Sequence, residues 1–457
     1  MKTLQKMIGK SDKNPQLNFF SIPLVQFINM EHELCVLAQK INWEMVEKEF
    51  APYYSKMGAP AVLVRTIVGL ILLKKIFNQS DESVIYRWVE NPYWQYFCGE
   101  TYFQKKPPFN PSDFVHFRKR IGEEGAEKIL KLSIDLFGEC KDKEVIVDTT
   151  VQEKNITYPT DTKLHKKIIE KCQDMAEEYG IELRQSYRRK VGELMMSQRF
   201  RKHPRSRKKA HAAARKLKTI AGRLTRELER KLPREAYLEH EGELALFHRV
   251  LKQVREDKNK IYSLHEPDVQ CIAKGKEHKP YEFGNKSSIA LTTGTGIIVG
   301  ALAFKENVYD GNTLPAQLRQ VKRMLGRYPD FVISDRGYRG RKKFCHTNIV
   351  TPGKLPASST PYERRKKRQR CRSRAAVEPI IGHVKKDHGM LRNYLKGTLG
   401  DSMNTMLSAA AFNFRKMLNR IKEELKPFWP DIYYCFYRQF FSGIGLKNVT
   451  VLKILTF

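Results

Sequence analysis

The sequence predicts an α/β fold class, with a mixed sheet flanked by helices, a long helical insertion and an all-helical N-terminal region. The first part of the chain has helical periodicity. Short apolar, β-branched runs begin at residue 144 and alternate with helices, and one long charged helical stretch interrupts them. Such alternation is typical of α/β domains. We therefore expect a helical N-terminal domain over 1–140, an α/β domain over 141–420 with an insertion at about 162–262, and an aromatic C-terminal tail over 421–457.

The N-terminal helices are indicated by apolar spacing and by helix-boundary residues. Residues 59–77 are densely apolar in a helical rather than an alternating pattern. Ser80 precedes two acids and a new apolar face, so it is expected to cap a helix. Asn91-Pro92 should end that helix, because a residue before proline avoids the helical region. Ser112 is expected to cap the next helix.

The predicted strands of the α/β domain are short. Val145–Val147 reads as a buried strand that ends in Asp148, and residues 330–334 read as a second one that ends in Asp335. Residues 287–293 and 296–304 flank Gly294-Thr295, which is a hairpin signature. A helix over 312–325, a strand over 344–350, a basic loop and helices over about 374–425 complete the expected elements.

The positive charge narrows the class of partner. The 457 residues include 84 Lys and Arg but 50 Asp and Glu, a net charge of +34. This charge argues against an enzyme of small metabolites and favours a polyanion. Residues 181–230 carry 17 basic and 4 acidic residues, and 361–375 carry 8 basic residues and Glu363 alone. Cations on phosphates release counterions, so such segments are typical of nucleic-acid binding.

Other sequence features exclude further classes of protein. The eight cysteines form no C-x-x-C pair, which argues against a structural zinc site and a disulfide framework. The N-terminus lacks the apolar region of a signal peptide. The most apolar stretch, residues 59–77, contains three basic residues and is too short and charged to span a membrane. We expect a cytoplasmic protein without a membrane partner.

Three acids are candidates for chemistry. Asp148 and Asp335 are predicted at the carboxyl ends of strands, where α/β sheets form sites, and Glu378 follows Asp335 by 43 residues. Mg²⁺ prefers oxygen ligands such as these carboxylates, and two Mg²⁺ ions serve phosphodiester cleavage well. An acid after a strand is often only a turn residue or a helix cap, so the spacing alone is weak evidence.

The local sequences resemble the DDE transposases of bacterial insertion sequences. The resemblance rests on VDTTVQ around Asp148, SDRGYRG around Asp335, and RAAVEPIIGHVKKDHGMLRNYLKG around Glu378. It extends through HEPDVQCIAKGKEHKPYEFGNK, NVYDGNTL and GDSMNTMLSAAAFNFRKML, and through the helical stretch 59–99. Together these segments cover roughly residues 40–420, in order.

The resemblance implies an RNase H-like catalytic core. Asp148 would lie on its first strand, Asp335 on its fourth and Glu378 on the following helix, as catalytic residues that hold two Mg²⁺ ions, with Mn²⁺ as a possible substitute. Many members carry a Y-x2-R-x3-E-x6-K signature, which Arg374, Glu378 and Lys385 match. Cys371 stands at the tyrosine position, which is a departure from this signature.

Double-stranded DNA is the partner that the resemblance implies, at the element's ends and at the target. The N-terminal helices would recognise terminal inverted repeats. Pairing two ends implies at least a homodimer, associated with the nucleoid when bound. His265 and Asp310 are held as supporting candidates near the acids or DNA. The candidate DNA-binding residues are Arg374, Lys385, Tyr338, His383, Arg205, Arg207, Lys208 and Lys209.

Two alternatives remain open at this point. An RNase H-like nuclease or resolvase would share the acids but would not transfer strands. A domesticated, non-catalytic DNA-binding protein would be expected to have lost a carboxylate, and all three are present. The sequence does not distinguish excision through a hairpin from excision through a circle.

Overall fold

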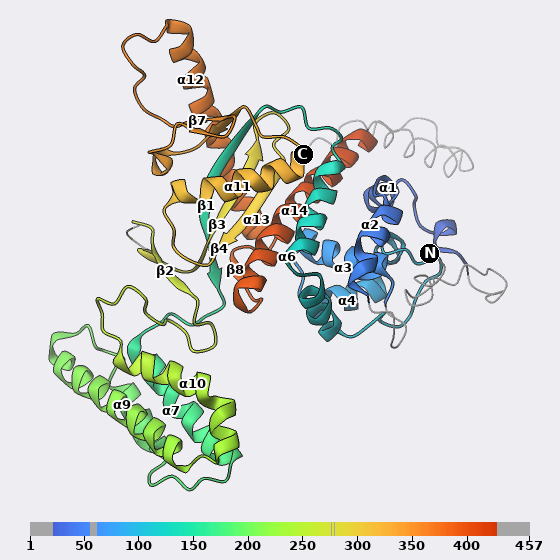
Figure 1. Ribbon diagram of the computed structural model, residues 1–457. Coiled ribbons are helices and arrows are strands. Elements are labelled where there is room, and N and C mark those ends of the chain that lie inside the picture. The colour runs from blue at the N-terminus through green and yellow to red at the C-terminus, as the bar shows by residue number, and fades with distance from the viewer. Residues whose placement is uncertain (1–21, 55–61, 276, 278, 427–457) are drawn as a thin grey trace, which may run out of the picture.

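A computed structural model describes residues 22–54, 62–275, 277 and 279–426 of the chain (Figure 1). The aromatic run expected in the C-terminal tail lies outside these residues. The N-terminal part is helical, as predicted. Its elements are η3 Leu24–Gln26, α1 Glu33–Lys40, α2 Trp43–Phe50, η4 Ala51–Tyr53, α3 Val64–Ile76, α4 Asp81–Glu90, α5 Pro92–Phe97 and α6 Pro111–Asp135.

The helix boundaries follow local chemistry. The Ser80 side chain caps α4 by accepting from the backbone N–H of Ser83, as predicted. Asn91 ends α4 and caps α5, which Pro92 begins. The predicted cap at Ser112 is wrong. Asn110 is the N-cap of α6 and forms a capping box with Asp113, because Pro111 occupies the first helical position, where its missing N–H costs nothing.

The sheet has the RNase H-like arrangement that the sequence predicts. Its strands are β1 Glu144–Lys154, β2 Gln270–Ala273, β3 Tyr281–Thr292, β4 Ile298–Phe304, β5 Phe331–Ile333, β6 Lys343–Phe344, β7 Thr347–Val350 and β8 Arg392–Asn393. The central order is β4-β3-β1-β5-β7. The pairs β4–β3 and β3–β1 are antiparallel, and the pairs β1–β5 and β5–β7 are parallel. β3 and β4 are the predicted hairpin, and α11 Asp310–Leu325 is the predicted helix after it.

The insertion forms a helical bundle with its own core. It contains α7 Asp161–Glu178, α8 Arg188–Met196, α9 Pro204–Lys231 and α10 Arg234–Lys252. Buried apolar residues of these helices form a cluster separate from the main core. Figure 1 shows the bundle lying beyond the sheet, joined to it after β1 and before β2.

The region after β7 is mostly helical, with β8 between its last two helices, and it corrects one prediction. The expected basic loop is instead a helix, α12 Pro361–Ser373. Thr360 and Glu363 form a capping box at its start, and lysine and arginine have high helix propensity. A 3₁₀ turn, η6 Arg374–Ala376, leads into α13 Val377–Asp387 and then α14 Gly397–Leu425.

One continuous core joins the N-terminal helices to the sheet. The long helix α14 packs on β4 and also contacts α1, α3 and α6 (Figure 1). Buried residues from α1 to α6, from the central strands and from α14 belong to one cluster. The change near residue 140 is therefore a change of element type within a single packed body. No helix among the described residues is both long and apolar enough to cross a membrane.

Candidate active site

Asp148 lies in the middle of β1, which corrects the expectation that it ends a strand. β1 continues to Lys154 because β3 pairs with it from Val145 to Glu153. The other neighbour, β5, pairs only with residues 144–146. The sheet therefore opens beside Asp148 on that side. Its carboxylate accepts from the backbone N–H of Thr149 at 2.8 Å, and its side chain is 16% exposed.

Asp335 sits two residues past the end of β5. Ile333 pairs with Ile146 in the parallel register, so Asp335 is level with Asp148 across the opening. The Asp335 carboxylate caps the short helix η5 Arg336–Tyr338 by accepting from the N–H of Gly337 at 2.8 Å. Strand pairing thus brings the first two acids together, as the RNase H-like core requires.

Glu378 is the second residue of α13. Val377 and Val384 on this helix are fully buried, whereas the Glu378 side chain is 70% exposed. Pro379 follows directly and is tolerated because it stands in the first turn, where its N–H would be unpaired. The backbone of Glu378 is therefore part of a helix packed on the core, and its carboxylate is solvated.

Arg374 connects the first and third acids. Its Nη1 lies 3.3 Å from Oδ2 of Asp148, and its Nη2 lies 3.5 Å from Oε1 of Glu378. The guanidinium is one-quarter exposed and stands in η6, directly between α12 and α13. A protein cation thus lies between two of the predicted metal ligands.

The pKa of Asp148 responds to its burial and to the other acids near it. Burial, and after it the negative charge of Asp335, raise the pKa of Asp148 to about 6. The Thr149 N–H and the Arg374 charge oppose this rise, and Asp310 adds to it. Asp335 and Asp310 thus lie close enough to Asp148 to disfavour its ionised form.

Asp310 begins α11 beside these acids. Its Oδ1 accepts from the Thr149 hydroxyl at 2.8 Å and from Nζ of Lys286 at 2.9 Å. Its Oδ2 would lie 3.0 Å from a Cβ placed on Gly337, so the turn after Asp335 has no room for a larger residue. The sequence indicated Asp310 only as a supporting candidate and did not indicate Lys286. The motif NVYDGNTL, which contains Asp310, was the sequence signal for this part of the site.

The three acids fit Mg²⁺ by their chemistry. All are hard oxygen donors, and Asp148 is an acid that lies close to the negative charge of Asp335. Within the described residues, however, no three Asp, Glu, His or Cys side chains converge closely enough to enclose an ion. Glu378 faces solvent and Arg374 lies between it and Asp148.

Tyr338 is a core residue, which contradicts its predicted contact with DNA. Its side chain is 1% exposed and belongs to the main core cluster. Burial, with the nearby charges of Asp148 and Asp310, raises its pKa well above the ordinary value. The aromatic residue after the second acid therefore lies in the core next to the acids and is not exposed at the surface.

The other candidates near Glu378, His383 and Lys385, lie on α13 in different surroundings. His383 is exposed and its Nδ1 lies 2.7 Å from Oδ2 of Asp387. Lys385 is partly buried, and this burial lowers its pKa, while Glu282 and Glu153 oppose the shift. Lys385 thus lies toward the far end of β1, away from Asp148. Cys371 is partly exposed in the last turn of α12.

The predicted cations of the insertion are on the surface. Arg205, Arg207, Lys208 and Lys209 are all exposed in the first turns of α9. That end of a helix carries a partial positive charge, so four cations there are unfavourable without an anionic partner. No acid stands in the first turn of α9.

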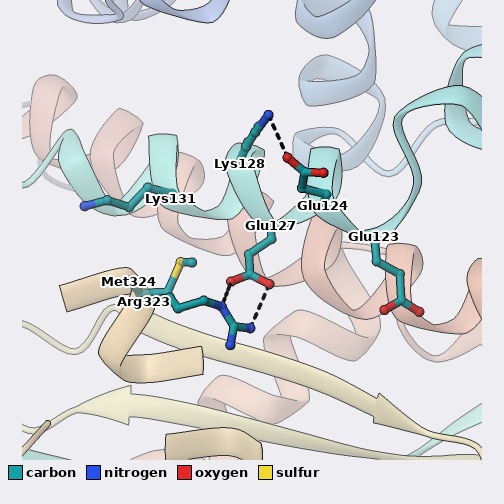
Figure 2. A pocket seen from close by; sticks show the side chains of 7 residues that line it. All are labelled: Glu123, Glu124, Glu127, Lys128, Lys131, Arg323 and Met324. Atoms are coloured by element: carbon teal, nitrogen blue, oxygen red, sulfur yellow. Dashed lines mark hydrogen bonds and ion pairs between the residues drawn. The ribbon is translucent and has the colours of Figure 1, made fainter. Parts of the chain in front are cut away.

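A surface hollow elsewhere holds none of the predicted catalytic residues (Figure 2). It has a volume of about 420 Å³ and lies between α6 and the end of α11 that is remote from Asp310. Four of its six charged residues pair with one another: Glu127 with Arg323, and Glu124 with Lys128. These pairs give no reason to place a substrate there.

Comparison with known proteins agrees with this geometry. Residues 23–120 match a family model described as a transposase domain (DUF772), and residues 252–414 match one described as a transposase DDE domain. The chain is also 42% identical over 187 residues to a Rhizobium meliloti protein called uncharacterized protein ORF8 in the nfe locus. That match covers 40% of this chain and 87% of the relative. No solved structure matches.

Proposed function

Because the chain belongs to the insertion-sequence DDE transposases, which act on DNA and use divalent metal ions, we propose that it binds the terminal inverted repeats of its element and catalyses Mg²⁺-dependent strand cleavage and strand transfer. The observation that carries this proposal is the nearness of Asp335 to Asp148, together with the link from Asp148 to Glu378 through Arg374. Asp335 is level with Asp148 across the opening beside β5, and Arg374 pairs with both Asp148 and Glu378.

In this proposal, Asp148, Asp335 and Glu378 hold two Mg²⁺ ions, for which Mn²⁺ substitutes. When bound, the ions activate the attacking oxygen and stabilise the leaving oxygen. The chain's own residues position the DNA. Arg374 moves from the acids to a phosphate, which is an equally good partner for a guanidinium. The exposed carboxylate of Glu378 is then free to turn inward.

The remaining predicted parts take supporting roles. The N-terminal helices would recognise the terminal repeats. Arg205, Arg207, Lys208 and Lys209 would follow the DNA backbone and add affinity rather than specificity. His383 and Lys385 would contact DNA beside Glu378. Pairing two element ends calls for a homodimer in the assembled complex.

The test is strand cleavage of a duplex that carries the DNA flanking the coding sequence, in Mg²⁺. We expect Asp148→Ala and Asp335→Ala to abolish cleavage, because each removes a proposed metal ligand. Both variants should retain DNA binding, because the cations that would contact phosphates are unchanged. Glu139→Ala, which removes an exposed acid elsewhere, is the control and should cleave normally. Cleavage at the wild-type rate by either aspartate variant would refute the assignment.

The same assay separates the alternatives. A product that joins the element's end to target DNA excludes a nuclease or resolvase without strand transfer. Calorimetry separates the third possibility, since a non-catalytic DNA-binding protein would show no Mg²⁺ binding that depends on Asp148 and Asp335.

A further inference from the structure

The basic helix α12 is anchored at one end only. None of its residues is buried, and Figure 1 shows it projecting beyond the edge of the sheet. The anchor is Arg370, whose guanidinium binds Glu144 at 2.7 and 2.9 Å and lies 3.4 Å from the centre of the Phe331 ring. The preceding turns have no apolar contact that would fold them against the sheet. Packing within the chain therefore does not explain why the first turns of α12 form a helix in this exposed position.

The charges of α12 surround its axis. Residues 364–368 are five consecutive cations, and at 3.6 residues per turn they point in every direction. The only acid of the helix, Glu363, is engaged in the capping box with Thr360. Arg364 and Arg368, like Arg368 and Arg372, are like charges four residues apart, which destabilises a helix. A partner that supplies negative charge on several sides would remove this penalty.

The major groove of DNA is such a partner. It is about 12 Å wide, admits an α-helix and has a row of phosphates on either side. An acidic protein surface, including one on a second copy of this chain, would reach only one side of α12 and would leave the remaining cations unpaired. The distribution of charge around the helix therefore favours duplex DNA over a protein.

The position of α12 decides which part of the DNA it would meet. Its last residue, Ser373, immediately precedes Arg374, which contacts Asp148 and Glu378. A helix of 13 residues is about 20 Å long. At 3.4 Å per base pair this length corresponds to about six base pairs. DNA in contact with α12 would therefore pass the acids within about half a helical turn.

We propose that α12 enters the major groove of the cleaved DNA end, within about six base pairs of the scissile phosphate, and holds that phosphate at the three acids. This inference rests on the proposed function, and it assigns to α12 a contact distinct from the terminal-repeat recognition expected of the N-terminal helices. Arg and Lys side chains that point into the groove would contact guanine N7 and O6, and those that point sideways would contact phosphates.

The test compares three triple variants of the full chain, two in α12 and one control. The first removes three exposed cations of α12, as Arg365→Ala, Lys366→Ala and Arg368→Ala. The control removes the same charge far from the acids, as Lys322→Ala, Arg420→Ala and Lys426→Ala, which are exposed at the ends of α11 and α14. A second α12 variant with Gln at the three positions removes the charge but keeps a polar side chain with good helix propensity. Because α12 buries no residue, unchanged thermal unfolding is expected and is checked first.

Two measurements follow, on a duplex of the DNA that flanks the coding sequence. Methylation of guanine N7 reports the major groove. We expect the wild type and the control to show interference within about six base pairs of the cleavage site, and both α12 variants to lose it while keeping interference farther out. The slope of log K against log salt should fall by up to about 3 in the α12 variants. Cleavage at saturating DNA should fall at least tenfold in them.

Retained N7 interference near the cleavage site, together with normal cleavage in the α12 variants, would overturn the inference. So would a loss confined to minor-groove contacts. If the wild type binds the duplex but does not cleave it in Mg²⁺, the proposed function fails, and the N7 comparison still decides whether α12 occupies the major groove.

Discussion

Arg374 forms an ion pair with Asp148 at 3.3 Å, although the two residues are 226 positions apart in the chain. The same guanidinium reaches Glu378, so the metal-free site already contains one positive charge. This charge partly offsets the repulsion between Asp148 and Asp335, and it stands where a metal ion would bring the acids together. Binding of DNA and binding of metal are therefore expected to be coupled through Arg374, which can pair with a phosphate instead.

We expect Arg374→Gln to bind Mg²⁺ more tightly than the wild type when DNA is absent. Removing the guanidinium removes a cation that repels the ion, and an ion pair of about 1 kcal/mol corresponds to roughly a five- to tenfold change in affinity. Calorimetric titration with Mg²⁺ measures this. Arg372→Gln is the matched control, since Arg372 is exposed and has no ion pair among the described residues. Equal Mg²⁺ affinity in the two variants would contradict the coupling.

Asp148→Asn is expected to stabilise the metal-free fold at pH 7.5 by about 1–3 kcal/mol. The pKa of Asp148 is about 6 in the folded protein and 3.8 in its reference state. The folded state therefore binds more protons between about pH 4 and 6, and the ionised carboxylate lowers stability above that window.

Urea unfolding in a chelating buffer at pH 7.5 and at pH 4 measures the free energy of unfolding of this variant. The gain should be present at pH 7.5 and mostly lost at pH 4, where wild-type Asp148 is protonated in the folded state and close to its reference pKa of 3.8 in the unfolded state. A gain of equal size at both pH values would show that ionisation of Asp148 is not its cause.

Asp401→Ala is expected to destabilise the protein by about 3–5 kcal/mol. Nζ of Lys154, which is 3% exposed, lies 2.8 Å from Asp401 and 3.3 Å from Glu266. Losing Asp401 leaves this buried cation undercompensated and frees Asn393, which donates to the same carboxylate. Urea unfolding at pH 7.5 measures the loss.

The matched control for Asp401 is Glu170→Ala, which breaks an exposed pair with Lys166 within α7. That change should cost less than about 0.5 kcal/mol, because surface pairs are solvated and screened. Similar losses in the two variants would mean that the buried pair at Lys154 contributes no more than a surface pair.

Replacing Arg205, Arg207, Lys208 and Lys209 with Ala should weaken DNA binding equally for element ends and unrelated duplexes. These side chains are exposed on α9 and would contact phosphates, which carry no sequence information. The slope of log K against log salt should fall by up to about 4. Fluorescence anisotropy over a salt series on both duplexes measures this, and a selective loss for element ends would instead indicate sequence recognition by α9.

Much of the fold follows from local sequence. The hairpin β3–β4, the helix α11 and the cap Ser80 were predicted because periodicity and capping chemistry act over a few residues. Two local predictions failed where local signals competed. Pro111 moved the cap of α6 to Asn110, and the capping box at Thr360 made a helix of the stretch expected to be a basic loop.

The sequence by itself identified the candidates for the chemistry, namely Asp148, Asp335 and Glu378 with a basic environment, because acids and cations in recurring motifs are visible without coordinates. Only the tertiary structure decided where these residues lie and which side chains they contact. Pairing with β3 placed Asp148 inside a strand, burial assigned Tyr338 to the core, and the turn η6 brought Arg374 between Asp148 and Glu378. The physical reason is that these relations depend on strand register and packing between distant segments, which local periodicity does not encode.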